Sequence, residues 1–206
     1  IAGQEGMVGS SINKQKKKKK FSIIECKRQD LDFTNQSRVE KFFRKKRPNI
    51  VINAAGKVGG ILDNKTYQSD YIFINSMIGL NIIKSSLKYN VKKLINLGSA
   101  CIYPKKTKQP IKESALLSSY LEETNEGYAL AKILSLKYSQ HLKKKYKKEF
   151  ISLMPANLYG RGDNFDLKSS HVLPALVKKF TLAKKNNIRK VEVWGSGKVK
   201  REFLNV

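Results

Sequence analysis

Short β-rich runs alternate with longer helical runs along this chain, and no other feature of the sequence constrains the fold as strongly. The predicted strands are short and rich in Ile, Leu, Val or Phe, and they cover residues 21–26, 50–53, 93–97 and 150–154. The predicted helices cover residues 7–18, 37–46, 70–89 and 128–146. Such alternation predicts an α/β fold: a doubly wound, Rossmann-like parallel sheet with helices on both faces.

The alternation stops after residue 154. A loop rich in Gly, Asn and Asp follows, then a predicted helix over 171–186 and a predicted short strand over 191–194. We therefore expect one domain over residues 1–160 and the incomplete beginning of a smaller C-terminal domain over 161–206.

Two of the predicted helices carry further information. Ser37 and Glu40 have the spacing of a capping box, in which two side chains satisfy free N–H groups at a helix start. In the helix at 70–89 apolar residues go nearly all the way round, so that one face can cover the sheet while the others need a second partner. This helix is either buried within the monomer or part of a dimer interface, and the sequence favours neither.

The charge balance is strongly basic. Lys and Arg number 42 against 16 Asp and Glu, which gives a net charge of +26. Such a field attracts any polyanion, including nucleic acid, an anionic membrane surface or a phosphorylated small molecule. The lysines are spread along the chain, and short lysine runs such as 16–20 and 143–145 are usually solvated surface. We therefore expect no specific nucleic-acid partner.

Other classes of protein are excluded more firmly. No run of eighteen apolar residues is present, so we expect no membrane span. Only Cys26 and Cys101 are available for disulfides, which favours a reducing compartment and a cytoplasmic protein. These cysteines and the two histidines, His141 and His171, lie far apart in sequence, which argues against a structural metal site.

Three glycines near the start of the chain follow the pattern G-x-x-G-x-x-G. Ile1-Ala2 is typical of the end of a first strand, and the glycines lead from it into the helix at 7–18. Glycines at this spacing allow a tight turn and the close approach of a pyrophosphate, which then meets the helix N-terminus. The pattern predicts a dinucleotide-binding loop, with a ligand-free turn as the alternative. The loop consists of Gly3, Gln4, Glu5, Gly6, Met7, Val8 and Gly9.

The end of the second predicted strand bears on which dinucleotide is bound. An acidic residue there binds a ribose 2′-hydroxyl, whereas a cation accepts the 2′-phosphate of NADP. This strand ends in Glu25-Cys26-Lys27-Arg28, and the guanidinium of Arg28 suits a phosphate. We therefore expect NADP as the cofactor, although Glu5 in the glycine loop would repel the same phosphate.

Tyr128 and Lys132 are predicted to lie on one face of a helix. Tyr89 and Lys93 share this spacing, but they straddle a helix end, whereas Ser99 and Tyr128 belong to the sheet edge where ligands gather. A nearby ammonium favours the phenolate and lowers the pKa of a tyrosine, so that Tyr128 can exchange a proton with a sugar oxygen. Ser99 would orient the same carbonyl by a hydrogen bond.

Eight segments make a resemblance to a known family specific. Over most of its length the chain resembles the GDP-L-fucose synthase family of extended short-chain dehydrogenases/reductases. The matching segments are AAGKVGGI at 54–61, LGSACIYP at 97–104, YALAK at 128–132, MPANLYG at 154–160, DNF at 163–165, SHVLPAL at 170–176, VWGSG at 193–197 and REFL at 201–204. Many nucleotide-sugar enzymes share the cofactor motifs, whereas the segments with Cys101, His171 and Trp194 point more narrowly to this family.

The resemblance implies an NADP-dependent epimerase-reductase of nucleotide-sugar biosynthesis. In that family GDP-4-keto-6-deoxy-D-mannose is epimerised at C3 and C5, and its C4 ketone is then reduced by NADPH to give GDP-L-fucose. Carbons beside a ketone exchange protons through an enolate, and Cys101 and His171 occupy the family's positions for this acid–base chemistry. The implied catalytic residues are Ser99, Cys101, Tyr128, Lys132 and His171.

The resemblance also implies ligand contacts and a quaternary structure. Residues 1–160 would be the NADP-binding domain and 161–206 the start of the substrate-binding domain, with a homodimer formed through the helices at 70–89 and 128–146. Lys179, Trp194 and Arg201 would meet the GDP part of the substrate. Besides the glycine loop and Arg28, the cofactor would be lined by Leu97, Gly98, Ser99, Ala100, Lys132, Pro155, Ala156, Asn157, Leu158 and His171.

The chain departs from the family pattern at several points. Glu5 stands where the family often has a base, Lys179 replaces a common Arg, and Asn205 interrupts the usual sequence after Phe203-Leu204. A complete first strand and further C-terminal elements are missing, so we expect this chain alone to bind weakly or to be inactive. The alternative is a nucleotide-sugar 4-epimerase or 4,6-dehydratase, which does not need Cys101 and His171. A basic nucleic-acid-binding protein on a reductase fold is a more distant alternative.

Overall fold

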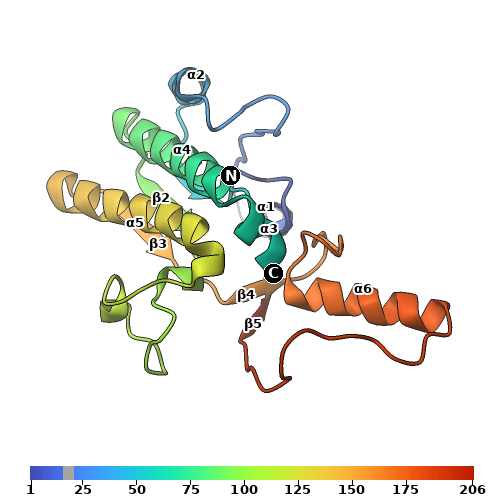
Figure 1. The fold of residues 1–206 in the computed structure, drawn as a ribbon. Helices are drawn as coiled ribbons and strands as arrows, with labels where there is room; N and C mark the ends of the chain where they lie inside the picture. Colours follow the sequence, from blue (N-terminus) through green and yellow to red (C-terminus); the bar gives the residue numbers. More distant parts are fainter. Residues whose placement is uncertain (16–20) are drawn as a thin grey trace.

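Three parallel strands form the centre of the molecule (Figure 1). The computed structural model describes residues 1–15 and 21–206, so the lysine run at 16–20 lies outside the described residues. The strands are β1 (Ile50–Asn53), β2 (Lys93–Leu97) and β3 (Glu149–Leu153), in the order β1-β2-β3. They confirm three of the predicted strands. The predicted end of a first strand survives as one parallel bridge, between Ala2 and Asn53.

Helices precede, connect and follow these strands. They are α1 (Met7–Lys14), α2 (Gln36–Lys46), a short α3 (Ile61–Thr66), α4 (Gln68–Lys88), α5 (Glu126–Tyr146) and α6 (Val172–Lys185). Each long helix begins within two residues of its predicted start. None of the described helices is both long enough and apolar enough to cross a membrane.

The predicted capping box at the start of α2 is wrong. The helix begins at Gln36, and the side chain of Asn35 accepts a hydrogen bond from the backbone N–H of Arg38 at 3.0 Å. Asn35 therefore occupies the capping position that the prediction assigned to Ser37. Asn is as good an N-cap as Ser, and the difference of two residues moves Glu40 out of the capping position.

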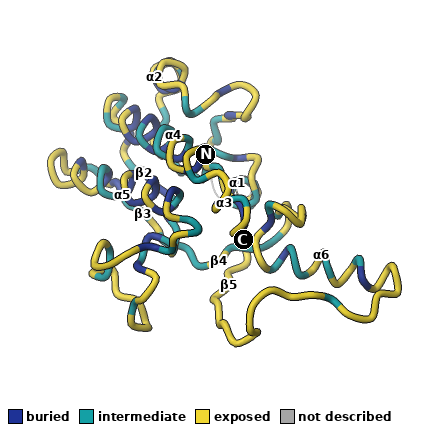
Figure 2. Tube along the Cα trace, viewed as in Figure 1, coloured by how far each residue is buried: buried dark blue, intermediate teal, exposed yellow. Residues whose placement is uncertain are grey.

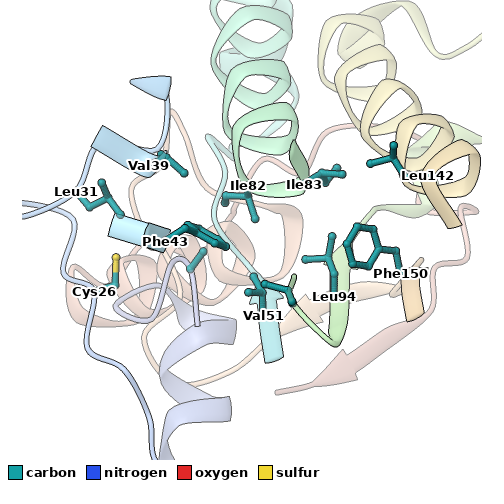
Figure 3. Packing of buried hydrophobic residues seen from close by; sticks show 12 residues of the cluster. Cys26, Leu31, Val39, Phe43, Val51, Ile82, Ile83, Leu94, Leu142 and Phe150 are labelled. Carbon is teal, nitrogen blue, oxygen red and sulfur yellow. The ribbon is translucent and has the colours of Figure 1, made fainter. Parts of the chain in front are cut away.

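The main core lies between the sheet and the long helices (Figure 3). Val51, Leu94 and Phe150 are matched in register across the three strands, so their side chains share one face of the sheet. Ile82 and Ile83 of α4 pack onto that face and are fully buried. The same cluster includes Val39 and Phe43 of α2 and Leu142 of α5. In Figure 3, α1 lies on the opposite side of the strands from α4, as a doubly wound sheet requires.

Two predicted strands do not form. Residues 21–26 pair with no strand among the described residues, because their neighbour in the sheet would be Ile1-Ala2, which offers too few backbone groups for a ladder. Cys26 is nevertheless buried in the main core. Residues 191–194 also form no strand, and Trp194 at their end is exposed. A strand pair that the pattern did not predict forms instead, between β4 (Asn157–Tyr159) and β5 (Phe203–Asn205).

The part of the chain after residue 160 differs in burial from the part before it. Figure 2 shows dark, buried segments concentrated in β1–β3, α4 and α5, while α6 and the segment that follows it are mostly exposed. Helix α6 buries only Pro174 and Ala183. In Figure 1 this helix extends away from the sheet, so few of its residues have a core to pack against.

Candidate functional site

The end of β2 turns directly into a short segment that carries two of the predicted catalytic residues. The backbone N–H of Gly98 donates to the carbonyl of Leu153 at 2.8 Å, which continues the sheet by one more bond. Ser99 then caps a single 3₁₀ turn, Ala100–Ile102, and its Oγ accepts a hydrogen bond from the N–H of Cys101 at 3.4 Å. Ser99 and Cys101 are thus held together at the carboxyl edge of the sheet, where ligands bind in open parallel sheets.

Tyr128 and Lys132 meet this edge from the first turns of α5. Lys132 is 8% exposed, and its Nζ donates to the carbonyl of Leu97 at 2.9 Å. The same Nζ lies 5.5 Å from the centroid of the Tyr128 ring, within the range of a cation–π contact. The helix therefore brings the predicted Tyr–Lys pair to the predicted Ser–Cys segment.

Burial dominates the titration of this group. It lowers the pKa of Lys132 to about 8, against a small opposing effect of Cys101. It raises the pKa of Tyr128, with Cys101 and Tyr71 adding to the rise. It also raises the pKa of Cys101, while the hydrogen bond with Ser99 and the charge of Lys132 oppose the rise. The expected lowering of the Tyr128 pKa is therefore not found, because the Lys132 ammonium binds Leu97 and is itself destabilised by burial.

His171 stands apart from these four residues. It is the N-cap residue of α6, and its side chain makes no capping hydrogen bond. Partial burial lowers the pKa of its imidazole, and the carboxylate of Asp163 opposes this. The charged group that acts on His171 is thus Asp163, not Cys101.

The glycine loop has the shape that a pyrophosphate requires. Gly3 has a φ of +75°, which other residues adopt only with strain, and a Cβ at Gly9 would collide with the carbonyl of Gly3. Helix α1 starts directly after Gly6, and no side chain of the described residues caps it. The buried side-chain oxygen of Gln4 also has no hydrogen-bond partner there. A close turn, free N–H groups at a helix start and an unpaired buried amide together fit a dinucleotide phosphate.

Glu5 and Arg28 lie next to each other. The backbone N–H of Arg28 donates to Oε2 of Glu5 at 2.7 Å. The structure therefore brings the predicted 2′-phosphate ligand and the carboxylate that opposes it to the same place. The hydrogen bond fixes the carboxylate on the backbone and leaves the Arg28 guanidinium without that partner.

The remaining predicted ligands lie at three places. Pro155, Ala156, Asn157 and Leu158 follow β3, and the Asn157 side chain donates to the carbonyl of Glu202 at 2.9 Å. Lys179 lies beside Trp194, with its Nζ 5.2 Å from the centroid of the indole. Arg201 is not part of that pair; its guanidinium donates to the neighbouring carbonyl of Lys200 at 3.1 Å. No three His, Cys, Asp or Glu of the described chain are grouped so that they could hold a metal ion.

Three residues near Tyr128 were missed by sequence reasoning. Tyr71 packs its ring edge against the Tyr128 ring, with centroids 6.1 Å apart, and its hydroxyl donates to Asp63. Asn75 accepts a hydrogen bond from the N–H of Lys57 at 2.9 Å and is buried. For Asn75 the available signal was a polar residue at a core position of α4, which is otherwise largely apolar.

Comparisons with known proteins place the chain among related enzymes. The whole chain, residues 1–206, matches the family described as NAD dependent epimerase/dehydratase. It is 50% identical to a GDP-L-fucose synthase of Sinorhizobium fredii over 99% of its own length and 65% of that relative's length. The chain thus spans slightly less than two thirds of this curated relative.

Two solved structures are similar throughout. A GDP-L-fucose synthetase from Naegleria fowleri bound to NADP superposes with a TM-score of 0.87 at 31% identity, covering 99% of this chain and 67% of that one. A GDP-D-glycero-L-gluco-heptose synthase from Campylobacter jejuni, in the presence of NADPH, gives a TM-score of 0.90 at 33% identity, covering 100% of this chain and 69% of that one. The fold, the site and the match over its full length agree: the chain belongs to the NAD-dependent epimerase/dehydratase family.

Proposed function

We propose that this chain carries the cofactor domain and part of the substrate domain of an enzyme that makes GDP-L-fucose. The substrate is GDP-4-keto-6-deoxy-D-mannose, which is epimerised at C3 and C5 and then reduced at C4. The observation that carries the proposal is the cluster of Ser99, Cys101, Tyr128 and Lys132 at the carboxyl edge of the sheet. The 50% identity to a GDP-L-fucose synthase supports the choice of substrate.

NADP is the proposed cofactor, and when bound as NADPH it supplies the hydride for C4. The loop from Gly3 to Gly9 holds its pyrophosphate through N–H groups at the start of α1. The Arg28 guanidinium is the proposed partner of the 2′-phosphate, with Glu5 held aside on the Arg28 backbone. The NADP bound to the Naegleria structure supports this choice.

Tyr128 is the proposed acid for the ketone oxygen. Its raised pKa keeps the phenol protonated at neutral pH, which is the form that can give a proton to C4 oxygen during reduction. Ser99 orients the same oxygen by a hydrogen bond, and Lys132 restores the proton and fixes the ring position through its contact with Tyr128.

Cys101 and His171 are the proposed acid–base pair for C3 and C5. The raised pKa of Cys101 keeps its thiol protonated, as an acid needs, while the lowered pKa of His171 keeps its imidazole neutral, as a base needs. The two residues come from different parts of the chain. In this proposal one removes a proton from one face of the sugar ring and the other delivers a proton to the opposite face.

Isotope exchange tests this assignment. With GDP-4-keto-6-deoxy-D-mannose in D₂O, His171→Gln should abolish deuterium incorporation at C3 and C5, and Cys101→Ser should abolish inversion at these carbons. Tyr128→Phe should spare both and stop NADPH consumption. A nucleotide-sugar 4-epimerase would leave both carbons unlabelled. The experiment uses this chain extended to the length of its curated relatives, because the chain spans slightly less than two thirds of that length.

We propose a domain boundary at residue 160 and a homodimer. All three strands of the central sheet lie before the boundary, and α6 with the exposed segment after it begins the substrate domain. Helices α4 and α5 each expose apolar side chains, including Phe73 and Leu134, which would meet the same helices of a second copy. Phe73→Glu should convert a dimer to a monomer in analytical ultracentrifugation.

We propose that the protein works in the cytoplasm and binds no specific nucleic acid. Cys26 and Cys101 are both free thiols, which suits a reducing compartment. Cell fractionation tests the location. Duplex or RNA binding with a steep salt dependence that survives Tyr128→Phe would instead support the nucleic-acid alternative.

A further inference from the structure

A buried tyrosine packs against the ring of Tyr128 and has no part in the proposed chemistry. Tyr71 of α4 is 0% exposed, and its ring meets the Tyr128 ring edge-on, at an interplanar angle of 84°. Its hydroxyl donates to Oδ2 of Asp63 in α3. Burial, together with this hydrogen bond, raises the pKa of Tyr71, so that it remains a hydrogen-bond donor at neutral pH.

The turn at Gly59-Gly60 closes around this pair. A Cβ at Gly59 would collide with both the Tyr71 hydroxyl and the Asp63 carboxylate, so the turn rests directly on them. The side chain of Asn64 donates to the carbonyls of Gly59 and Gly60, at 2.7 and 3.0 Å. The turn therefore packs directly on the hydrogen-bonded side chains of Tyr71 and Asp63.

The other side of the same turn contacts the residues just before His171. The N–H of Gly60 donates to the carbonyl of Ser169 at 2.8 Å, and a Cβ at Gly60 would collide with the carbonyl of Ser170. Ser170 is buried, in a part of the chain that is otherwise mostly exposed. A continuous set of contacts therefore joins Tyr128 to His171. It runs through Tyr71, Asp63, Gly59, Gly60, Ser169 and Ser170.

We propose that Tyr71 and Asp63 are positioning residues that fix His171 relative to Tyr128. The inference rests on the proposed function, in which these two groups move protons at different carbons of one sugar ring. Tyr128 is placed by a helix packed in the core, whereas His171 follows an exposed loop and needs a tie to the sheet. A misplacement of about 1 Å can cost about 100-fold in rate, so such a tie matters for catalysis.

The hydrogen bond, not the charge of Asp63, carries this role. An amide oxygen accepts from a phenol as a carboxylate does, so Asp63→Asn should preserve the tie, whereas Asp63→Ala should break it. Tyr71→Phe keeps the ring against Tyr128 and removes only the hydroxyl. Tyr67→Phe is a matched control, because Tyr67 lies one turn earlier on the same side of the chain and is 50% exposed.

Histidine NMR tests the tie without any substrate. The chain has two histidines, His171 and His141, so ¹³C-labelled histidine gives two imidazole signals, and His141 on α5 serves as the internal reference. Tyr71→Phe and Asp63→Ala should shift or broaden the His171 signal and leave that of His141 in place. Asp63→Asn and Tyr67→Phe should move neither. An unmoved His171 signal in both Tyr71→Phe and Asp63→Ala overturns the proposal.

A second readout uses turnover in the longer protein. Tyr71→Phe should lower deuterium incorporation at C3 and C5 about 10-fold and leave the KM for NADPH within about twofold. The double variant Tyr71→Phe/Asp63→Ala should be no slower than the slower single variant, because one hydrogen bond is lost in each case. Losses that multiply would show two independent effects and overturn the proposal. A wild-type protein that turns over no GDP-4-keto sugar would contradict the proposed function, while the NMR result would still decide the positioning role.

Discussion

Two lysines lie over aromatic rings at nearly the same distance, but one pair is buried and the other is largely exposed to solvent. Lys132 is 5.5 Å from the Tyr128 centroid and 8% exposed, whereas Lys179 is 5.2 Å from the centroid of Trp194, which is 69% exposed. The first pair lies at the edge of the sheet and has strongly altered acid–base properties. Burial, more than the contact itself, thus separates a pair suited to proton transfer from a pair suited to binding.

The helices that carry the two pairs explain the difference. Helix α5 packs against α4 and the sheet and buries nine of its residues, while α6 buries two. The buried side chains of α5 have neighbours from α4 and from the sheet. Those on α6 and the following segment are held mainly by local contacts, which places that region at the low end of local stability.

The largest expected effect is at the buried pair. Tyr128→Phe should lower ketone reduction by about 10²- to 10⁴-fold, because the phenol proton is lost while the ring and its packing remain. The measurement is NADPH consumption under single turnover. Tyr120→Phe is the control, since Tyr120 is 90% exposed and its hydroxyl should not matter. Equal rates for Tyr128→Phe and Tyr120→Phe would remove Tyr128 from the mechanism.

The second prediction compares the stability lost on truncating a side chain in the main core with that lost on truncating one on α6. Leu94→Ala should lower the free energy of unfolding by about 2–5 kcal/mol, because Leu94 is 0% exposed and its removal leaves a cavity under α4. Phe180→Ala on α6 should cost about 1 kcal/mol or less, because Phe180 is 53% exposed. Urea unfolding of both variants provides the values. Similar losses at the two sites would mean that α6 is packed as firmly as the sheet.

The sequence predicted the sheet with α4 and α5 far better than it predicted α6 and the segment after it. Strands such as β1 and β2 are short and mostly apolar, and α4 and α5 have enough apolar residues to be recognised one helix at a time. The pairing of β4 with β5 joins residues 157–159 to 203–205, and no local pattern signals a contact over that separation. The strand expected at 21–26 was lost for the same reason, because a strand exists only with a partner.

At the candidate site, too, features that depend on residues far apart in the sequence could not be predicted. Spacing and context were enough to choose Tyr128 over Tyr89 and to place Ser99 at the sheet edge. The direction of the Tyr128 pKa was not predictable, since an ammonium and burial act in opposite directions and only the fold gives their sizes. The Tyr71–Asp63 hydrogen bond depends on how α3 packs on α4, which no motif records.

The third prediction concerns the pH dependence of stability. The pKa of Lys132 is about 8 in the folded chain and 10.5 as its unperturbed value, so between these values the unfolded chain binds more protons. Stability contributed by this group therefore rises with pH from about 8 to about 10.5, by at most about 3 kcal/mol. Below pH 8 the lysine is charged in both states, and the cost of burying that charge is fully present.

The test compares the free energy of unfolding as a function of pH for two proteins that both carry Cys101→Ser, one with Lys132 and one with Lys132→Met. The raised pKa of Cys101 has the opposite effect, because its thiol loses a proton first in the unfolded chain and so lowers stability as the pH rises. Without that thiol, the Cys101→Ser protein should gain stability above pH 8 relative to the double variant Cys101→Ser/Lys132→Met. Parallel pH profiles would mean that Lys132 is not charged at a cost in the folded chain.

The smallest effect on stability is expected at the exposed pair. Trp194→Ala should change the free energy of unfolding by less than about 1 kcal/mol, because an exposed cation–π contact is worth about 0.5–1 kcal/mol. The same change should weaken GDP binding several-fold in the longer protein if the indole packs on the nucleotide, as measured by calorimetry. Lys179→Met should act in the same direction, whereas Lys179→Arg should strengthen binding, because a guanidinium can hold a diphosphate through two hydrogen bonds. A large loss of stability with unchanged GDP affinity would reverse the assignment and make Lys179 and Trp194 a structural pair.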